Sequence, residues 1–151
     1  MKLEEEINQK KFTSETQKLI INMIYTNNWL ENKMKTFFDE AKLTPQQYNV
    51  LRILRGSKDS LSTNQIRERM LDKMSDASRI VDRLILKSLV SKKTDTTDKR
   101  LVQVEITKKG LKLLESLDPR ISEMEGGMIG LTKADSVLMN ALLDKMRALK
   151  K

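Results

Sequence analysis

The chain has 151 residues, with 29 lysines and arginines, 21 aspartates and glutamates, and neither histidine nor cysteine. Those two absences exclude a Ser-His-Asp triad, a thiolate nucleophile, a disulfide, a thiol-based redox sensor and a thiolate zinc site. A net charge of +8 favours a polyanionic partner, with nucleic acid first. No apolar run reaches the roughly 20 residues that span a bilayer. We expect a single-domain cytoplasmic protein that is not an enzyme and needs no cofactor or metal.

The basic surplus is concentrated in the middle of the chain. Residues 57–110 carry 13 basic and 8 acidic side chains, whereas residues 1–56 carry 9 and 7, and residues 111–151 carry 7 and 6. A basic centre between near-neutral ends indicates a binding module carried on a scaffold. The alternative that charge alone leaves open is a solvated face.

Both ends of the chain read as long amphipathic helices. Residues 13–41 contain no glycine or proline, and their apolar residues recur at helical spacing. Near the other end, Thr132 with Asp135 forms a variant capping box before a second apolar stripe over 137–149. A second copy of the chain is the economical partner for such stripes, and a monomeric helical bundle is the alternative. The carboxylates of residues 4–6 read as a solvated tail.

Three helices are predicted between residues 44 and 88. Thr44-Pro45-Gln46-Gln47 and Ser62-Thr63-Asn64-Gln65 are helix starts, and Gly56 should end the first helix. Ser75 is the expected cap of the third helix, with Asp76 in its first turn. Its outer face has hydrogen-bonding groups suited to a major groove. They are Ser75, Asp76, Ser78, Arg79, Asp82 and Arg83.

Two strands and a final helix follow. Residues 89–93 and 101–106 read as strands, the second with alternating valine and isoleucine, and a polar loop over 94–100 joins them. Residues 107–110 open a helix that Pro119 should kink and Gly126-Gly127 should end. The expected fold class is mainly α with a small β-hairpin wing, a winged helix-turn-helix. In it, the wing cations Lys92, Lys93, Lys99 and Arg100 would seek phosphates.

Several segments together resemble the MarR family of transcriptional regulators. Residues 78–84 resemble its recognition helix, and Leu89-Val90 resembles the start of its wing. Asp98-Lys99-Arg100 followed by residues 104–110 resembles its wing signature, and residues 131–147 resemble its C-terminal dimerisation helix. The resemblance implies one MarR-type domain with an N-terminal dimerisation helix (1–42), a DNA-binding lobe (43–110) and C-terminal dimerisation helices (111–151).

The family resemblance implies specific roles. Members are homodimers that bind double-stranded DNA at pseudo-palindromic operators, and each wing reaches the minor groove. Asp98 should pair with Arg100 to brace the wing, and Lys99 should enter the groove where the family commonly has arginine, so that minor-groove readout is weaker. The family tends to have glycine where this chain has Ser88. Ser88 therefore implies a strained or altered helix end.

The family also implies a small-molecule effector. Members often bind small, frequently anionic aromatic ligands, and binding releases DNA. The residues that could line such a pocket are Trp29, Met34, Phe37, Phe38 and Tyr48, and packing in the core is the alternative for them. The predicted function is a homodimeric DNA-binding regulator, acting as a repressor that a small organic ligand, such as a phenolic one, relieves. A winged-helix protein-interaction module without specific DNA binding is the alternative.

Overall fold

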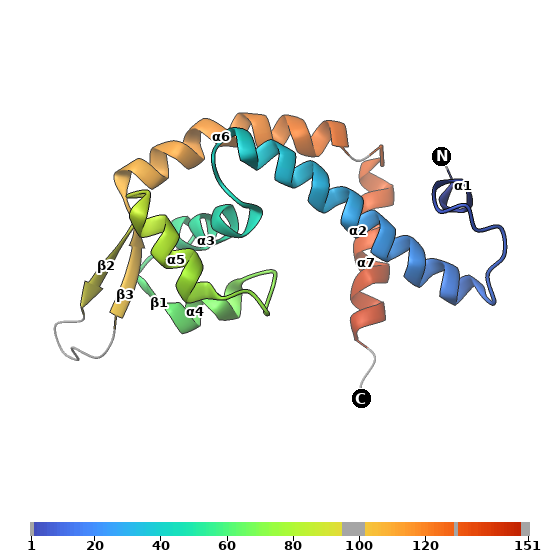
Figure 1. The fold of residues 1–151 in the computed structure, drawn as a ribbon, viewed down its shortest axis with the longest axis horizontal. Coiled ribbons are helices and arrows are strands. Elements are labelled where there is room, and N and C mark those ends of the chain that lie inside the picture. Colours follow the sequence, from blue (N-terminus) through green and yellow to red (C-terminus); the bar gives the residue numbers. More distant parts are fainter. Residues whose placement is uncertain (1, 95–101, 129, 149–151) are drawn as a thin grey trace. The chain divides into compact units, whose positions relative to one another are not determined.

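The computed structural model describes residues 2–94, 102–128 and 130–148 and is mainly helical (Figure 1). The chain divides into two compact units, Met1–Gly110 and Leu111–Lys151. The elements in chain order are α1 (Leu3–Glu6), α2 (Glu15–Glu40), α3 (Pro45–Arg55), β1 (Leu61–Ser62), α4 (Thr63–Arg69), α5 (Ala77–Leu86), β2 (Val90–Thr94), β3 (Val102–Ile106), α6 (Lys108–Met128) and α7 (Lys133–Arg147). This order of helices and strands confirms the predicted winged helix-turn-helix fold class.

The expected solvated tail at the N-terminus is wrong. Residues 3–6 form the short helix α1, in which Leu3 is buried. The Lys18 ammonium donates to the Glu4 carboxylate, and the Tyr25 hydroxyl donates to the Glu6 carboxylate over 2.8 Å. These two contacts with α2 order the acidic run. The sequence pattern missed them because the partners lie 14 and 19 residues away.

The three capping boxes predicted from the sequence are all present. In each, the side chain before the helix accepts from the backbone N–H three residues later, and the side chain at that later position accepts in return. The pairs are Thr44 with Gln47, Ser62 with Gln65, and Thr132 with Asp135. Each box satisfies N–H groups that have no partner inside the helix, so these helix starts are fixed locally.

Glycine is a poorer guide to helix ends in this chain. Gly56 ends α3 at φ −78°, which is not the left-handed geometry of a glycine cap. The helix α6 continues through Pro119 and Gly126 to Met128, so the expected end at Gly126-Gly127 is wrong. No glycine that the structure describes has a positive φ. The glycines therefore supply none of the left-handed turns that end a helix.

Ser88 provides the altered helix end that the sequence predicts. Its φ is 59°, in the left-handed region. The Ser88 N–H donates to the Ile85 carbonyl over 2.8 Å, and the Leu89 N–H donates to the Leu84 carbonyl over 3.0 Å. These are the two hydrogen bonds of a Schellman motif. Leu84 and Leu89 are both buried, which adds the apolar contact that accompanies this motif. The motif turns the chain from α5 into β2.

Replacing Ser88 by glycine is expected to raise the free energy of unfolding by about 0.5–1 kcal/mol. The left-handed conformation costs a residue with a Cβ about 1–2 kcal/mol, and the added chain entropy of glycine offsets part of that gain. Thermal or urea unfolding measures the change. The control is Ser57→Gly, at a position without positive φ, which should leave stability unchanged or lower it. A Ser88→Gly variant that is less stable than the wild type would contradict the backbone strain inferred at Ser88.

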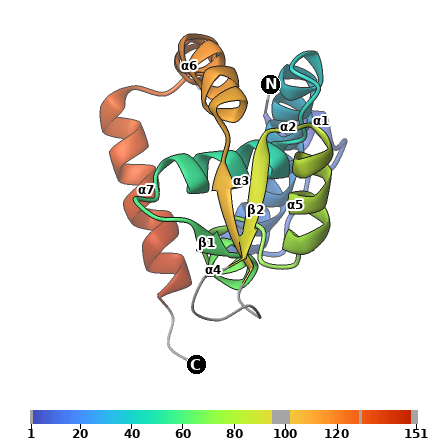
Figure 2. The same ribbon diagram turned by 90° about the vertical axis from the view of Figure 1, so that its left-hand side faces the viewer.

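The wing and the helices of the lobe share one core. β3 lies between β1 and β2 in a three-stranded antiparallel sheet (Figure 2), with Leu61 opposite Val104 and Val90 opposite Ile106. Leu51, Ile66, Val81, Leu84 and Val104 are fully buried and come from α3, α4, α5 and β3. The sequence did not reveal β1, because a two-residue strand is too short to show alternation.

The apolar positions of the terminal helices are largely exposed. On α2, Leu19, Ile20 and Ile24 are each more than half exposed. On α7, the same holds for Val137, Leu138 and Leu142. No helix in the described ranges is both long and apolar enough to cross a membrane.

Candidate DNA-binding surface

The helix α5 begins at a different cap from the one predicted. Asp76, not Ser75, is the N-cap, and its side chain accepts from the Arg79 backbone N–H over 3.1 Å. A carboxylate at this place also complements the partial positive charge of the helix N-terminus. Ser75 was the wrong choice because its hydroxyl donates instead to the Asp72 carboxylate, over 2.5 Å.

The turn before α5 is closed by Asp72. Its carboxylate accepts from the Ser75 hydroxyl and from the Met74 backbone N–H, the latter over 2.9 Å. These hydrogen bonds, above all the one from Ser75, hold the pKa of Asp72 below the ordinary aspartate value. The carboxylate is therefore charged near neutral pH and fixes the geometry of the chain as it enters α5.

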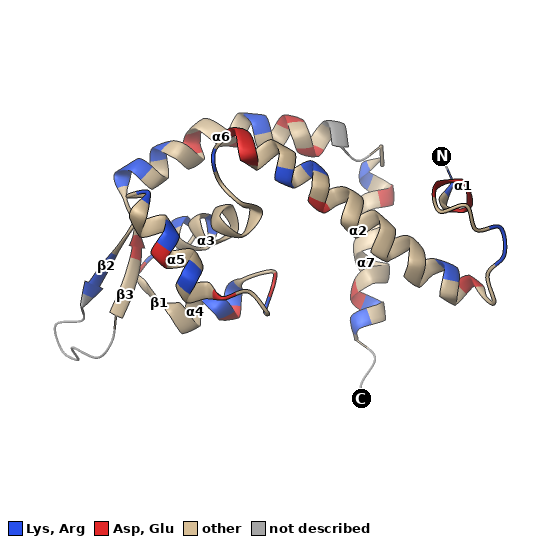
Figure 3. Ribbon diagram, in the orientation of Figure 1, with Lys and Arg blue, Asp and Glu red and all other residues tan. Residues whose placement is uncertain are grey.

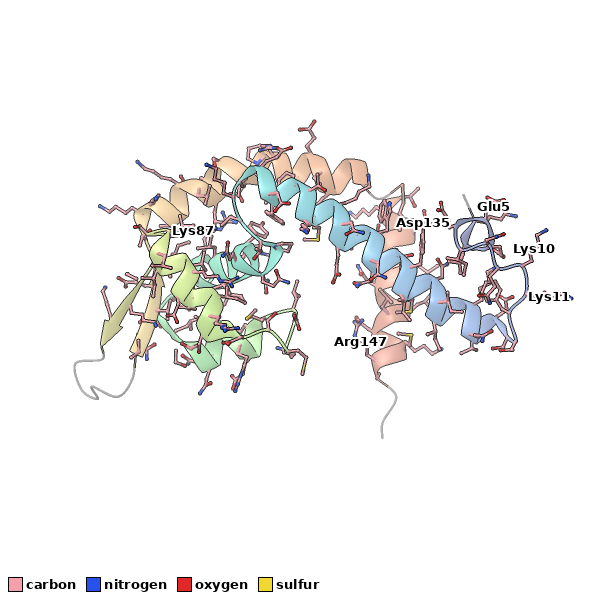
Figure 4. All side chains as sticks on the ribbon, viewed as in Figure 1. Glu5, Lys10, Lys11, Lys87, Asp135 and Arg147 are labelled. Atoms are coloured by element: carbon pink, nitrogen blue, oxygen red, sulfur yellow. The ribbon has the colours of Figure 1, made fainter. Side chains whose placement is uncertain are left out.

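The other end of α5 is tied to α3. Lys87 lies at the end of α5 (Figure 4), and its ammonium donates to the side-chain oxygen of Gln47 over 2.9 Å and to the Lys42 carbonyl. Gln47 is buried and belongs to the capping box of α3. This contact fixes the position of α5 against the lobe, in addition to its buried face of Ala77, Val81 and Leu84.

The opposite face of α5 is open. Ser78, Arg79, Asp82 and Arg83 are exposed, as the sequence predicts. The Arg79 side chain is 80% exposed, and its Nε lies 3.9 Å from the Asp76 carboxylate, at the limit of an ion pair. Such a loose surface pair contributes little energy and leaves the guanidinium able to bind elsewhere. Figure 3 shows basic residues along α5 and on β2.

A hollow of about 310 Å³ adds residues of α4 to this surface. Thr63, Asn64 and Arg67 line it together with Lys73 and with the start of α5. No sequence motif assigns a DNA-binding role to these residues. The only signal for them was their place in the basic middle third, because α4 and α5 are brought together by the tertiary fold.

Two of the predicted wing cations, Lys92 and Lys93, pair with carboxylates of their own unit. The Lys92 ammonium lies 2.7 Å from the Asp82 carboxylate of α5, and the Lys93 ammonium lies 2.7 Å from the Glu105 carboxylate of β3. Both lysines stay exposed, so a phosphate would compete with these carboxylates. Asp98, Lys99 and Arg100 lie outside the described residues.

The structure brings together only part of the predicted ligand pocket. Met34 and Tyr48 line a cavity of about 350 Å³. Phe38 is fully buried, with its ring stacked on Tyr48 at 4.5 Å and Phe37 against its edge at 5.0 Å. Trp29 is partly exposed, and the Lys33 ammonium lies 5.4 Å from its ring. Phe38 therefore packs in the core, which was the alternative for these aromatic residues.

Most of the cavity wall could not be predicted from the sequence. The wall combines apolar, amide and charged side chains from α2, α3 and the segment after α4. Besides Met34 and Tyr48, it contains Asn27, Leu30, Glu31, Pro45, Gln46, Asn49, Arg52, Met70, Leu71 and Asp72. These residues are up to 45 positions apart in the sequence and carry no shared motif, so only the fold reveals them.

Comparison with known proteins shows a similarity to one family over the middle of the chain. The family model described as "MarR family" matches residues 41–101, the range that contains α3, β1, α4, α5 and β2. Over these residues the chain is similar to the MarR family. This confirms the resemblance drawn from the recognition-helix and wing motifs.

Two curated relatives, both HTH-type transcriptional regulators, come from Bacillus subtilis. The HTH-type transcriptional regulator YwaE is 35% identical over 88 residues, which are 58% of this chain and 52% of that protein. The chain thus matches about half the length of YwaE. The HTH-type transcriptional regulator MhqR is 27% identical over 127 residues, 84% of this chain and 87% of that protein.

Three solved structures share the fold over almost the whole chain. The MarR transcription factor of Planctomyces limnophilus is 28% identical, with a TM-score of 0.68 over 90% of this chain and 99% of that one. MepR of S. aureus, solved with DNA, is 24% identical, with a TM-score of 0.75 over 91% and 98%. BpsR of Bordetella bronchiseptica, whose DNA binding 6-hydroxynicotinic acid regulates, is 23% identical, with a TM-score of 0.73 over 93% and 99%.

Proposed function

We propose that the chain is a homodimeric, sequence-specific DNA-binding transcriptional regulator, a repressor that a small organic ligand releases from DNA. The observation that carries the proposal is the open face of α5, where Ser78, Arg79 and Arg83 are exposed. The opposite face of this helix is buried, and its N-terminus is capped. The guanidinium of arginine can donate two hydrogen bonds to the O6 and N7 acceptors of guanine, and a serine hydroxyl can contact either kind of base pair. A helix of ten residues, roughly 15 Å long, fits a major groove.

Pairing of two chains is the second part of the proposal. The exposed apolar residues of α2 and α7 need a partner, because contiguous apolar surface on a protein marks an interaction site. A second copy is the simplest partner, and two-fold dimers are the commonest oligomers. Two recognition helices related by such an axis would occupy successive major grooves of a pseudo-palindromic operator, roughly 34–36 Å apart.

The wing supplies the contacts that do not depend on sequence. By resemblance to the family, Lys99 enters the groove and Asp98 braces Arg100. Lys92 and Lys93 would exchange their carboxylate partners for phosphates at modest cost, because exposed ion pairs are weak. MepR, of the same fold, has been solved with DNA, which supports this use of the fold.

Replacing Lys99 by alanine is expected to weaken binding to specific and random DNA alike. One phosphate contact fewer should flatten the slope of log affinity against log salt by about 1. Fluorescence anisotropy at several salt concentrations measures this slope. The matched control is Lys10→Ala, in the segment after α1 (Figure 4), which should keep the wild-type slope. An unchanged slope for Lys99→Ala would exclude the proposed contact.

The effector would bind in the cavity between α2 and α3. Leu30, Met34 and Tyr48 give it an apolar wall, and its volume of about 350 Å³ suits a small aromatic molecule. Regulation of the DNA binding of BpsR by the small molecule 6-hydroxynicotinic acid supports a small-molecule effector in a protein of this fold.

A gel shift with the DNA upstream of the protein's own gene tests the proposal. We expect a discrete complex at low salt that survives an excess of random DNA, because base contacts add to the phosphate contacts. The absence of any complex with that DNA and with the neighbouring promoters would contradict it. That outcome would favour the alternative of a winged-helix module that binds proteins instead.

A further inference from the structure

One short loop borders both the cavity and the DNA-reading end of α5. Residues 71–75 join α4 to α5. Leu71 and Asp72 line the cavity, whereas Met74 and Ser75 line the hollow at the start of α5. The Leu71 backbone N–H donates over 3.2 Å to the side chain of Asn49, which lines the cavity as well. A change at the cavity wall can therefore reach α5 through five residues of chain.

Hydrogen bonds, rather than apolar packing, hold this loop. Leu71 is 83% and Met74 93% exposed, so their burial contributes little. Both carboxylate oxygens of Asp72 are used, one by the Met74 N–H and the other by the Ser75 hydroxyl. Apart from these, the Lys73 ammonium donates to the Glu68 carbonyl. Asp72 is therefore part of the cavity wall, and its hydrogen bonds also fix the backbone just before the N-cap of α5.

We propose that Asp72 is a positioning residue that couples the cavity to DNA binding, and that an organic cation in the cavity weakens DNA binding by taking over the hydrogen bonds of its carboxylate. The inference rests on the proposed function and names the regulation of that cavity. Asp72 itself need not touch DNA. It acts through Met74, Ser75 and the start of α5.

The chemistry of Asp72 selects the charge of the ligand. A carboxylate only accepts hydrogen bonds, so a molecule that competes for it must donate them. Glu31 and Asp72 on the cavity wall are both acidic, against the single guanidinium of Arg52. The Arg52 guanidinium carbon lies 6.0 Å from the centroid of the Tyr48 ring. An amidinium on an aromatic ring offers paired donors for the carboxylate and an apolar body for the rest of the cavity.

The test uses the full chain, a labelled duplex from upstream of its own gene, and two probes of the same shape and opposite charge. Benzamidine hydrochloride and sodium benzoate are compared at equal ionic strength, because DNA affinity depends on salt. Anisotropy reports DNA binding. Isothermal titration calorimetry of the chain alone reports probe binding without DNA. Asp72→Ala removes the acceptor, and Asp72→Asn keeps a group that can bond both Met74 and Ser75 but removes the charge. The control is Asp59→Ala, an exposed aspartate in the loop after α3.

In the wild type and in Asp59→Ala, benzamidine should bind the chain and lower DNA affinity at least threefold, and benzoate should do neither. Asp72→Asn should bind DNA within twofold of the wild type but lose the response to benzamidine. Asp72→Ala should bind DNA at least threefold more weakly without any probe. Wild-type DNA affinity in Asp72→Ala, a full benzamidine response in Asp72→Asn, or an equal effect of benzoate would overturn the inference and leave DNA binding intact. A wild type that binds no DNA would instead refute the proposed function.

Discussion

Alanine at position 110 is expected to lower the free energy of unfolding of the Met1–Gly110 unit by about 2–3 kcal/mol. A Cβ at Gly110 would lie 2.4 Å from the Leu89 carbonyl oxygen and 2.7 Å from Cγ1 of Ile106. The Leu89 carbonyl cannot retreat freely, because it accepts from the Thr107 N–H over 3.0 Å. The clash therefore falls where β2, β3 and the start of α6 meet. Urea unfolding of the purified variant measures the loss.

Gly126 provides the matched control for this prediction. It lies in the same helix, α6, and a Cβ there would meet nothing within 4 Å. Gly126→Ala should therefore raise stability by about 0.5–1 kcal/mol, the usual gain of alanine over glycine inside a helix. If Gly110→Ala were as stable as the wild type, the close approach of Gly110 to the wing would be refuted.

Arg79→Ala is expected to cost about 1–3 kcal/mol of binding to the specific DNA and to relax specificity at one base pair. The guanidinium is exposed on α5 and only loosely paired with Asp76, so little inside the protein is lost with it. Binding to random DNA should fall much less, because phosphate contacts dominate there. Anisotropy titrations with the specific and a scrambled duplex at one salt concentration separate the two effects.

The control for Arg79 is Arg147→Ala. Arg147 is also exposed and pairs with an aspartate three residues away, Asp144, but it belongs to α7 (Figure 4). The Arg147→Ala variant should keep the wild-type ratio of affinity for the specific duplex to affinity for the scrambled duplex. Equal losses on both duplexes for Arg79→Ala would mean that this arginine contacts phosphate rather than a base.

Local signals in the sequence predicted the helix starts well. A capping box needs only two side chains three residues apart, so Thr44 with Gln47 and Ser62 with Gln65 could be read directly. The altered helix end at Ser88 was likewise visible as a missing glycine. Both Ser75 and Asp76 fit the local pattern for the N-cap of α5. Asp76 is the cap, because the Ser75 hydroxyl donates its hydrogen bond to the Asp72 carboxylate instead.

The features that escaped the sequence depend on distant partners. β1 exists because Leu61 and Ser62 pair with β3, some 40 residues further on. The lysines of β2 looked free to bind phosphate, yet Lys92 meets the Asp82 carboxylate of α5. The cavity wall draws on residues from Asn27 to Asp72, which share no motif. Periodicity and spacing carry no information on contacts between residues that lie far apart in the sequence.

A hydroxyl-radical footprint of the protein on the DNA upstream of its gene tests the central claim most directly. The account predicts two protected half-sites related by a pseudo-palindrome, with centres one helical turn, roughly 34–36 Å, apart. Each half-site would report one recognition helix α5 of a homodimer. A single protected half-site, or uniform protection that shifts with the ends of the duplex, would contradict a dimer that reads DNA through α5.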